Sequence, residues 1–238
     1  TWSTAAAMNS TPDALIGRGV DCIDTPAAVI DLDAMERNIA RMAGFARKHG
    51  MRWRPHAKLH KSAAIALLLT QAGACGHCVQ KLSEAEALAA GGVRDLFISN
   101  EVIAPHKLLR VARLAAELAA RGGRLGIAVD GPEGITRLAR AMDAAGSDAG
   151  IDVFVEIDVG QGRCGAAPGP EAVALALAVA AGPRLHFAGL HAYQGRAQHL
   201  RTVAERRAAI AHAAQVASAT RALIEAAGLA VPLVTGAG

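Results

Sequence analysis

The strongest constraint on the fold is a regular alternation between short apolar runs and longer alanine-rich segments with helical spacing. Eight apolar runs follow an opening stretch of mixed composition. They are Ala27–Leu32, Met51–Pro55, Gly76–Gln80, Asp95–Ser99, Leu125–Val129, Val153–Ile157, Leu185–Leu190 and Val231–Thr235. Short apolar runs bounded by turn residues favour buried strands, and strands that alternate with helices favour a parallel sheet with crossover helices.

The segments between these runs are rich in alanine, leucine, glutamate and arginine, which are good helix formers. The predicted helices are Met35–His49, Lys61–Ala72, Ser83–Ala90, His106–Ala120, Pro132–Ala145, Pro170–Ala181 and Gln198–Ala227. We expect Asp33 to cap the first of them. We expect Ser83 to cap the third, because Glu86 follows three residues later in the spacing of a capping box.

Eight strand–helix units in 238 residues match a closed (β/α)8 barrel, which typically takes about 250 residues. An open doubly wound sheet would instead place a glycine-rich turn after its first strand, and residues 31–34 read Asp-Leu-Asp-Ala. We therefore predict an α/β fold of the TIM-like barrel type, with residues 1–24 as an N-terminal arm and residues 25–238 as the barrel domain. No helix follows the eighth predicted strand, so we expect either a fragment or an abrupt end.

The composition excludes several classes of function. Hydrophobic residues make up 52% and charged residues 19%, which is typical of a folded globular chain. Aromatic residues reach only 3%, which argues against a base-stacking surface for nucleic acid. No apolar stretch approaches the roughly 18 residues of a membrane span. With four cysteines and no signal-peptide pattern, we expect a reducing, cytoplasmic setting.

Chemistry in a barrel sits where strands end, so the residues at those ends are the candidates for a site. Lys58 follows the second predicted strand, where apolar neighbours would lower the pKa of its amine and prepare it to form a Schiff base. The alternative is a cluster of solvated bases at a helix start. Arg163 follows the sixth strand in a glycine-rich loop, as a cation at the mouth or as the ion-pair partner of Asp158.

The ends of the seventh and eighth predicted strands supply three further candidates for the site: an aromatic ring, a general base and a glycine-rich loop. Tyr193 is the only tyrosine of the chain, and a tyrosine at a strand end can stack on a planar ligand. His199, six residues later, is a candidate general base, although a histidine near a helix start is more often structural. Thr235, Gly236 and Gly238 belong to a loop whose backbone N–H groups would form an anion site.

Two further segments carry polar or sulfur-containing side chains. Gln80 ends the third predicted strand and is a candidate for polar lining of the mouth. Residues 75–78 read Cys-Gly-His-Cys, which invites a metal site, but no second cysteine pair exists to complete four ligands. We interpret these cysteines as core residues and predict no metal ligands in this chain.

The order of lysine, arginine, tyrosine and glycine-rich loop resembles the fold-type III pyridoxal-phosphate enzymes, whose cofactor domain is a barrel of the alanine racemase N-terminal type. Residues 54–62, Arg-Pro-His-Ala-Lys-Leu-His-Lys-Ser, are similar to the lysine signature of the D-threonine aldolase and D-serine dehydratase family. Supporting matches are Thr25-Pro26-Ala27, Ser83-Glu84-Ala85-Glu86, Asn100-Glu101-Val102, Asp158-Val159-Gly160 and Arg163-Cys164-Gly165. Residues 192–199 resemble the 3-hydroxy-D-aspartate aldolase branch. Leu59 departs from the threonine usual beside the lysine.

The resemblance implies a lyase that cleaves D-configured β-hydroxy amino acids with pyridoxal 5'-phosphate. It implies Lys58 and His199 as catalytic residues. The implied cofactor-binding residues are Lys58, His56, Gln80, Arg163, Tyr193, Thr235, Gly236 and Gly238. It also implies a homodimer, and a divalent metal (Mg, Mn or Zn) whose ligands lie in a C-terminal β domain that is absent from this chain.

Two other functions stay open at this point. The same cofactor and lysine serve β-elimination in D-serine or 3-hydroxyaspartate dehydratases. Single-domain barrels of this length also act as non-catalytic pyridoxal-phosphate carriers. The expected partner is a small-molecule amino acid, with neither nucleic acid nor membrane.

Overall fold

The structure is a computed structural model that describes residues 12–236. It divides into two compact units, residues 1–42 and residues 43–238. In the first unit the 3₁₀ turns Pro12–Leu15 (η1) and Val20–Cys22 (η2) precede helix α1, Leu32–Lys48, which continues into the second unit. The Asp31 carboxylate accepts a hydrogen bond from the Ala34 N–H at 2.9 Å, so Asp31 caps α1 in place of the predicted Asp33.

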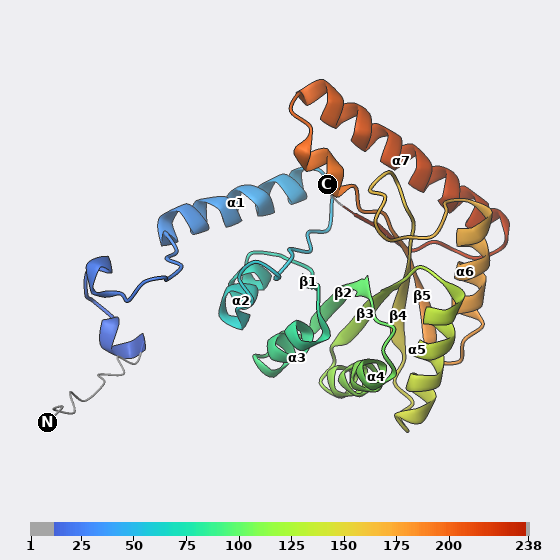
Figure 1. The fold of residues 1–238 in the computed structure, drawn as a ribbon, viewed down its shortest axis with the longest axis horizontal. Helices are drawn as coiled ribbons and strands as arrows, with labels where there is room; N and C mark the ends of the chain where they lie inside the picture. Colours follow the sequence, from blue (N-terminus) through green and yellow to red (C-terminus); the bar gives the residue numbers. More distant parts are fainter. Residues whose placement is uncertain (1–11, 237–238) are drawn as a thin grey trace, which may run out of the picture. The chain divides into compact units, whose positions relative to one another are not determined.

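The second unit holds one parallel sheet whose strands follow in chain order. They are β1 His77–Val79, β2 Asp95–Glu101, β3 Arg124–Val129, β4 Ile151–Glu156, β5 Leu185–His191 and β6 Val234–Thr235. The sheet curves into a half-barrel (Figure 1). The parallel α/β prediction is confirmed, but six of the eight predicted strands form within residues 12–236.

The two missing strands have separate physical causes. Residues 27–31 form no strand, and Val29 and Ile30 are 62% and 50% exposed. β-Branched residues favour a strand only where they pack on a pleated, half-buried surface, and these two residues have no such surface. The run Met51–Pro55 is reduced to an isolated bridge between His56 and Cys78. Pro55 has no N–H to donate to a ladder, although its carbonyl accepts from the Cys78 N–H at 2.9 Å.

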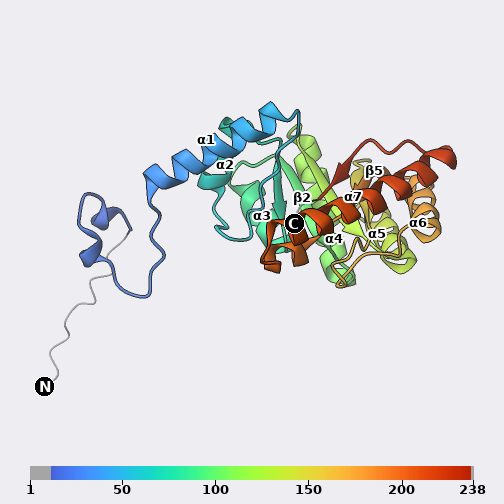
Figure 2. The same cartoon turned by 90° about the horizontal axis from the view of Figure 1, so that it is seen from above.

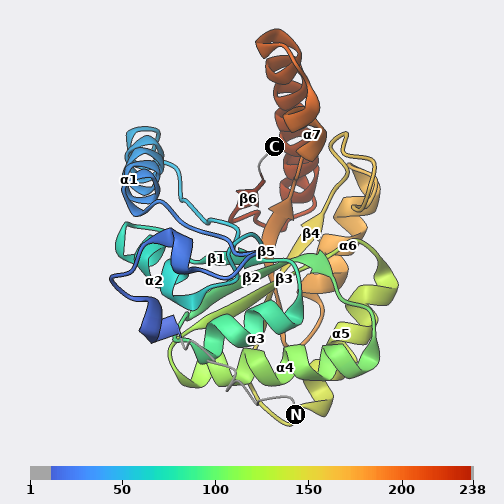
Figure 3. The same cartoon turned by 60° about the vertical axis from the view of Figure 1, so that its left-hand side comes forward.

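The crossover helices lie close to their predicted positions. They are α2 Ala63–Gln71, α3 Leu82–Ala90, α4 Pro105–Ala120, α5 Pro132–Ala144, α6 Pro170–Ala180 and α7 Val203–Ala226, with a 3₁₀ turn η3 at Gly195–His199. Figures 1 and 3 show α3, α4 and α5 along the same side of the sheet, and Figures 1 and 2 show α7 beside α6. No helix within residues 12–236 has the length and apolarity needed to cross a membrane.

The N-cap of helix α3 is Lys81, two residues before the Ser83 that the capping-box pattern predicts. Glu84, not Glu86, occupies the third position of the helix, and its carboxylate accepts from the Gln80 and Lys81 N–H groups at 2.9 and 3.2 Å. Glu86 instead pairs with Arg110 on α4. The cap therefore fixes the backbone of Gln80, where β1 ends.

Apolar side chains fill both faces of the sheet. The larger cluster lies between strands and helices and includes Leu96, Ile98, Leu108, Ile127 and Val153, all at most 1% exposed. A smaller cluster, formed by Phe97, Ala128 and Phe154, faces inward, and the two phenylalanine rings lie 4.8 Å apart. This inner cluster closes the floor below the carboxyl ends of the strands.

Candidate active site

A cavity of about 240 Å³ opens at the carboxyl ends of the strands, above the inner apolar cluster. Its wall comes from segments that are far apart in the sequence. The lining residues are Arg54, His56, Lys58, Cys78, Gln80, Phe97, Ser99, Arg163, His191, Tyr193, Gln198, Thr235 and Gly236. Among the predicted site residues within the described part of the chain, only His199 is missing from this set.

Lys58 follows the bridge that aligns His56 with β1. Its side chain is exposed, and Leu59 beside it is 91% exposed, so the predicted apolar wall around the amine is wrong. Its neighbours are polar instead. The Lys58 N–H donates to His56 Nδ1 at 3.2 Å, which turns the lysine out of the bridge toward the cavity.

His56 is held as a neutral imidazole. Ser99 Oγ donates to the Val79 carbonyl at 3.2 Å, so it accepts from His56 Nε2, also at 3.2 Å. Since Nδ1 accepts from Lys58, the hydrogen resides on Nε2. Burial, with a further contribution from the Lys58 charge, lowers the pKa of His56 to about 4. The lysine therefore has an uncharged neighbour at neutral pH.

This shift predicts a loss of stability in acid. The folded pKa of His56 lies below the ordinary 6.5, so the unfolded chain binds its proton first as the pH falls. The free energy of unfolding should decrease from about pH 6.5 to pH 4. Between pH 7 and 4.5, after allowance for solvent screening, the wild type should lose about 1 kcal/mol more than His56→Gln. Urea denaturation measures the difference, and equal losses would contradict the assignment.

Arg163 and Tyr193 lie together on one side of the cavity. The Arg163 guanidinium carbon lies 5.4 Å from the centroid of the Tyr193 ring, a cation–π contact. Asp158, the alternative partner of Arg163, is occupied by the N–H groups of Gly160 and Gly162 at 2.9 and 3.0 Å. The arginine therefore remains available at the mouth, with its NH2 group 4.0 Å from Glu156.

Thr235 and Gly236 line the cavity where β6 ends. The Thr235 carbonyl accepts from the Ala192 N–H at 2.8 Å and holds this end of β6 beside the residue that follows β5. A Cβ atom on Gly236 would lie 2.0 Å from the Ala192 carbonyl oxygen, so only glycine fits there. Gly238, the third residue predicted for this loop, lies outside the described residues.

His199 ends the turn η3 and is exposed. Its neighbour Gln198 lines the cavity, but His199 itself does not. The histidine that the structure places in the wall is His191, at the end of β5. Sequence reasoning missed it, although its position at a strand end was a signal that could have found it.

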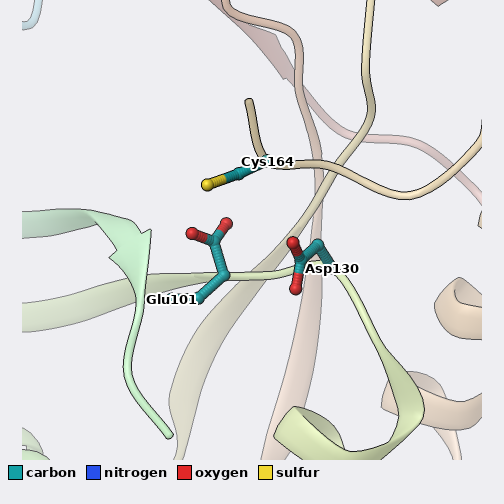
Figure 4. A group of neighbouring side chains, drawn as sticks. All are labelled: Glu101, Asp130 and Cys164. Carbon is teal, nitrogen blue, oxygen red and sulfur yellow. The ribbon is translucent and has the colours of Figure 1, made fainter. Parts of the chain in front are cut away.

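Three polar side chains that the sequence did not single out lie close together near the cavity. Glu101 ends β2, Asp130 follows β3 and Cys164 lies in the loop after β4, with one ligand-type atom of each within 4.8 Å of the others (Figure 4). Burial raises the pKa of the Cys164 thiol, and the neighbouring Glu101 raises it further. The cluster therefore joins two carboxyl groups to a protonated thiol.

The cysteines of residues 75–78 do not form such a group. Cys78 lines the cavity, and burial raises the pKa of its thiol to about 12. His77 is buried and hydrogen bonds to Thr70 Oγ1 at 2.9 Å. Cys75 and Cys78 are both partly exposed, and Cys78 packs at the edge of the inner cluster, so the expected core position of these cysteines is wrong.

Comparisons with known proteins show which family the chain resembles. The family model described as "Alanine racemase, N-terminal domain" matches residues 30–238. The 3-hydroxy-D-aspartate aldolase of Paracoccus denitrificans (strain Pd 1222) is 44% identical over 227 residues, covering 94% of this chain and 57% of the relative. The D-threo-3-hydroxyaspartate dehydratase of Delftia sp. (strain HT23) is 40% identical over 170 residues, covering 71% of this chain and 41% of the relative.

Among solved structures, the D-threonine aldolase from Filomicrobium marinum superposes with a TM-score of 0.85 at 46% identity. The match covers 91% of this chain and 57% of that one. The chain thus spans about half the length of the relatives it matches, from 41% to 57%. Within that span the sequence and the fold agree, and the chain belongs to the alanine racemase N-terminal domain family, in the fold-type III pyridoxal-phosphate group.

Proposed function

We propose that residues 25–238 form the pyridoxal-phosphate-binding barrel domain of an aldehyde-lyase that cleaves D-configured β-hydroxy amino acids. The substrate is 3-hydroxy-D-aspartate, which gives glycine and glyoxylate, or D-threonine, which gives glycine and acetaldehyde. The observation that carries the proposal is the single cavity that joins Lys58 to Arg163, Tyr193 and the Thr235–Gly236 turn. The aldolases among the similar proteins support it.

The residues of the cavity fit this cofactor. Pyridoxal phosphate presents an aldehyde, a flat ring and a phosphate, and the wall offers a primary amine, the Tyr193 ring and a tight glycine turn. Among residues 12–236, no aspartate or glutamate lines the cavity, whereas Lys58 and Arg163 do, so the wall suits an anionic ligand.

When bound, the cofactor supplies an electron sink for breaking the Cα–Cβ bond of an amino acid. Lys58 would supply the amine that holds the cofactor covalently. Tyr193 and Arg163 would hold its ring, and Gly236 and Thr235 would bind its phosphate. His56 and Gln80 would line the site together with Lys58. The neutral His56 adds no second positive charge beside the lysine.

The proton of the substrate's β-hydroxyl requires a base. His199 stays the proposed base; its neighbour Gln198 lines the cavity, which supports the proposal, although His199 itself does not line it. A divalent metal also belongs to the proposal, with ligands outside this chain. The wall lacks carboxylates and carries three cations, so it does not fit such an ion, and no step is assigned to one here. We further propose a cytoplasmic homodimer.

A product assay tests the proposal. The full protein is given pyridoxal phosphate, a divalent metal and D-3-hydroxyaspartate. We expect glycine and glyoxylate in equal amounts. Oxaloacetate and ammonia would instead establish a dehydratase, the alternative that the Delftia relative favours. If neither pair forms although the protein turns yellow, D-threonine is the next substrate, and its inertness would leave a cofactor carrier.

A further inference from the structure

Glu156 and His191 form a cross-strand pair on the inner face of the half-barrel. They are Cα partners in the register of β4 and β5, and the Ile157 N–H donates to the His191 carbonyl at 2.9 Å. Because side chains alternate along a strand, Glu156 shares a face with Phe154, two residues earlier, which belongs to the inner apolar cluster. The sheet therefore brings a carboxyl group and an imidazole together where these two strands end.

The two side chains are in direct contact and have little freedom. Oε2 of Glu156 lies 2.8 Å from Nδ1 of His191, and the two residues are 3% and 7% exposed. The Phe97 ring meets the imidazole edge-on, with 5.4 Å between the ring centroids. The hydrogen bond fixes which edge of the imidazole faces Glu156, and Phe97 restricts the tilt of its plane. His191 is therefore held in one orientation.

The contact also decides which nitrogen of His191 carries the hydrogen. Burial opposes ionisation of Glu156, but the hydrogen bond with His191, together with nearby positive charge that includes Arg163, outweighs it and lowers the pKa of the Glu156 carboxyl. An ionised carboxylate has no hydrogen to donate, so His191 donates from Nδ1. In the neutral ring the lone pair is then on Nε2.

The Nε2 atom of His191 is the one that a ligand can reach. His191 lines the cavity, and within residues 12–236 its Nε2 atom neither makes a hydrogen bond nor is buried without a partner. Since Nδ1 is occupied by Glu156, Nε2 is the only polar atom that the side chain can offer. The wall therefore presents a hydrogen-bond acceptor here, in the same cavity as the donors Lys58 and Arg163.

Glu156 faces a second residue of the wall with its other oxygen. Oε1 lies 4.0 Å from Nη2 of Arg163, which lines the cavity, whereas Glu156 itself does not. Both neighbours are donors, and a carboxylate offers an acceptor to each of them. An amide of the same shape offers an acceptor to only one, because its other end is an NH2 group. The pair of neighbours therefore explains why this buried position holds a carboxylate.

We propose that Glu156 is a positioning residue, which fixes the hydrogen of His191 on Nδ1 from behind the wall, so that His191 presents Nε2 as an acceptor to an O–H or N–H group bound in the Lys58 cavity. The position of the hydrogen is a property of this chain alone. The use of the acceptor in cleavage rests on the proposed function.

Nitrogen-15 NMR of the full protein labelled at histidine tests the position of the hydrogen, with no cofactor added. At about pH 8, where an ordinary histidine is neutral, we expect a protonated Nδ1 and an unprotonated Nε2 for His191. The signals are assigned by their loss in His191→Gln. A hydrogen on Nε2 in the wild type would overturn the proposal without any variant of Glu156.

Glu156→Gln keeps the shape of the side chain and should invert the tautomer. Arg163 can only donate, so it claims the amide oxygen, and the NH2 group then faces Nδ1. His191 can accept there by moving its hydrogen to Nε2, and we expect the two nitrogen signals to exchange character. The matched control Glu84→Gln alters another buried glutamate, one that accepts from the Gln80 and Lys81 N–H groups, and should leave them unchanged. A protonated Nδ1 that persists in Glu156→Gln contradicts a positioning role.

The product assay then separates this role from the proposed function. In Glu156→Gln, Lys58 is intact and the cofactor should still attach, but a donor replaces the acceptor, so we expect the cleavage rate to fall by about tenfold or more. An inverted tautomer with an unchanged rate would refute the use of the acceptor. A wild type that has the expected tautomer but cleaves no substrate would refute the proposed function and leave the positioning of His191 standing.

Discussion

Lys58→Ala should abolish covalent retention of pyridoxal phosphate and reduce the cleavage rate by about 10³-fold or more, because no other amine lines the cavity within residues 12–236. The wild type should keep its visible absorbance after dialysis, and the variant should lose it. Borohydride reduction followed by peptide mass analysis should place the cofactor on the peptide that contains Lys58.

The matched control is Lys61→Ala. Lys61 belongs to the same segment, but its Nζ lies 3.6 Å from Glu84 and it does not line the cavity. This variant should retain the cofactor and its absorbance. Attachment to another lysine, or retention after dialysis in Lys58→Ala, would refute the assigned role of Lys58 even if the protein cleaves its substrate.

Gly189→Ala should produce the largest loss of stability among single methyl additions in the sheet. Gly189 lies in β5 with a φ of +132°, and a Cβ atom there would lie 1.8 Å from the Leu233 carbonyl oxygen. That oxygen accepts from the Leu190 N–H at 2.9 Å, so relieving the clash breaks the pairing with β6. We expect the free energy of unfolding to fall by about 4 kcal/mol.

Gly92→Ala separates the clash from the backbone strain. Gly92 has a φ of +97°, also in the region that favours glycine, but nothing lies within 4 Å of its added Cβ atom. This control should lose about 1 kcal/mol. Urea denaturation of both variants measures the comparison, and similar losses would mean that the β5–β6 contact is far looser than described.

Much of the fold could be predicted because burial leaves a mark on the sequence. The run Val153–Ile157 predicts β4 well, since its residues are packed between two apolar layers. The run Ala27–Leu32 carries the same type of pattern and yet forms no strand. Its composition records a propensity, and only a pairing partner turns propensity into a strand.

Some residues of the candidate site could likewise be predicted from the sequence, and others could not. Lys58, Arg163, Tyr193 and Thr235 could be found because parallel strands bring their carboxyl ends to one edge. The contact of Glu156 with His191 could not, because the two are 35 residues apart and each resembles an ordinary strand residue.

Strand β6 is short, and the cavity has its full lining only while β6 is paired with β5, because Thr235 and Gly236 are among the lining residues. Two residues form this strand, which pairs with Leu190 and His191 of β5, and the Leu190 and Ala192 N–H groups donate to the carbonyls of Leu233 and Thr235 at its two ends. A strand of two residues at the edge of a sheet opens at a small free-energy cost, and a ligand that needs Thr235 and Gly236 favours the closed state by mass action. Occupancy of the site and protection of the Leu190 and Ala192 amides from hydrogen exchange are thus two readings of one equilibrium.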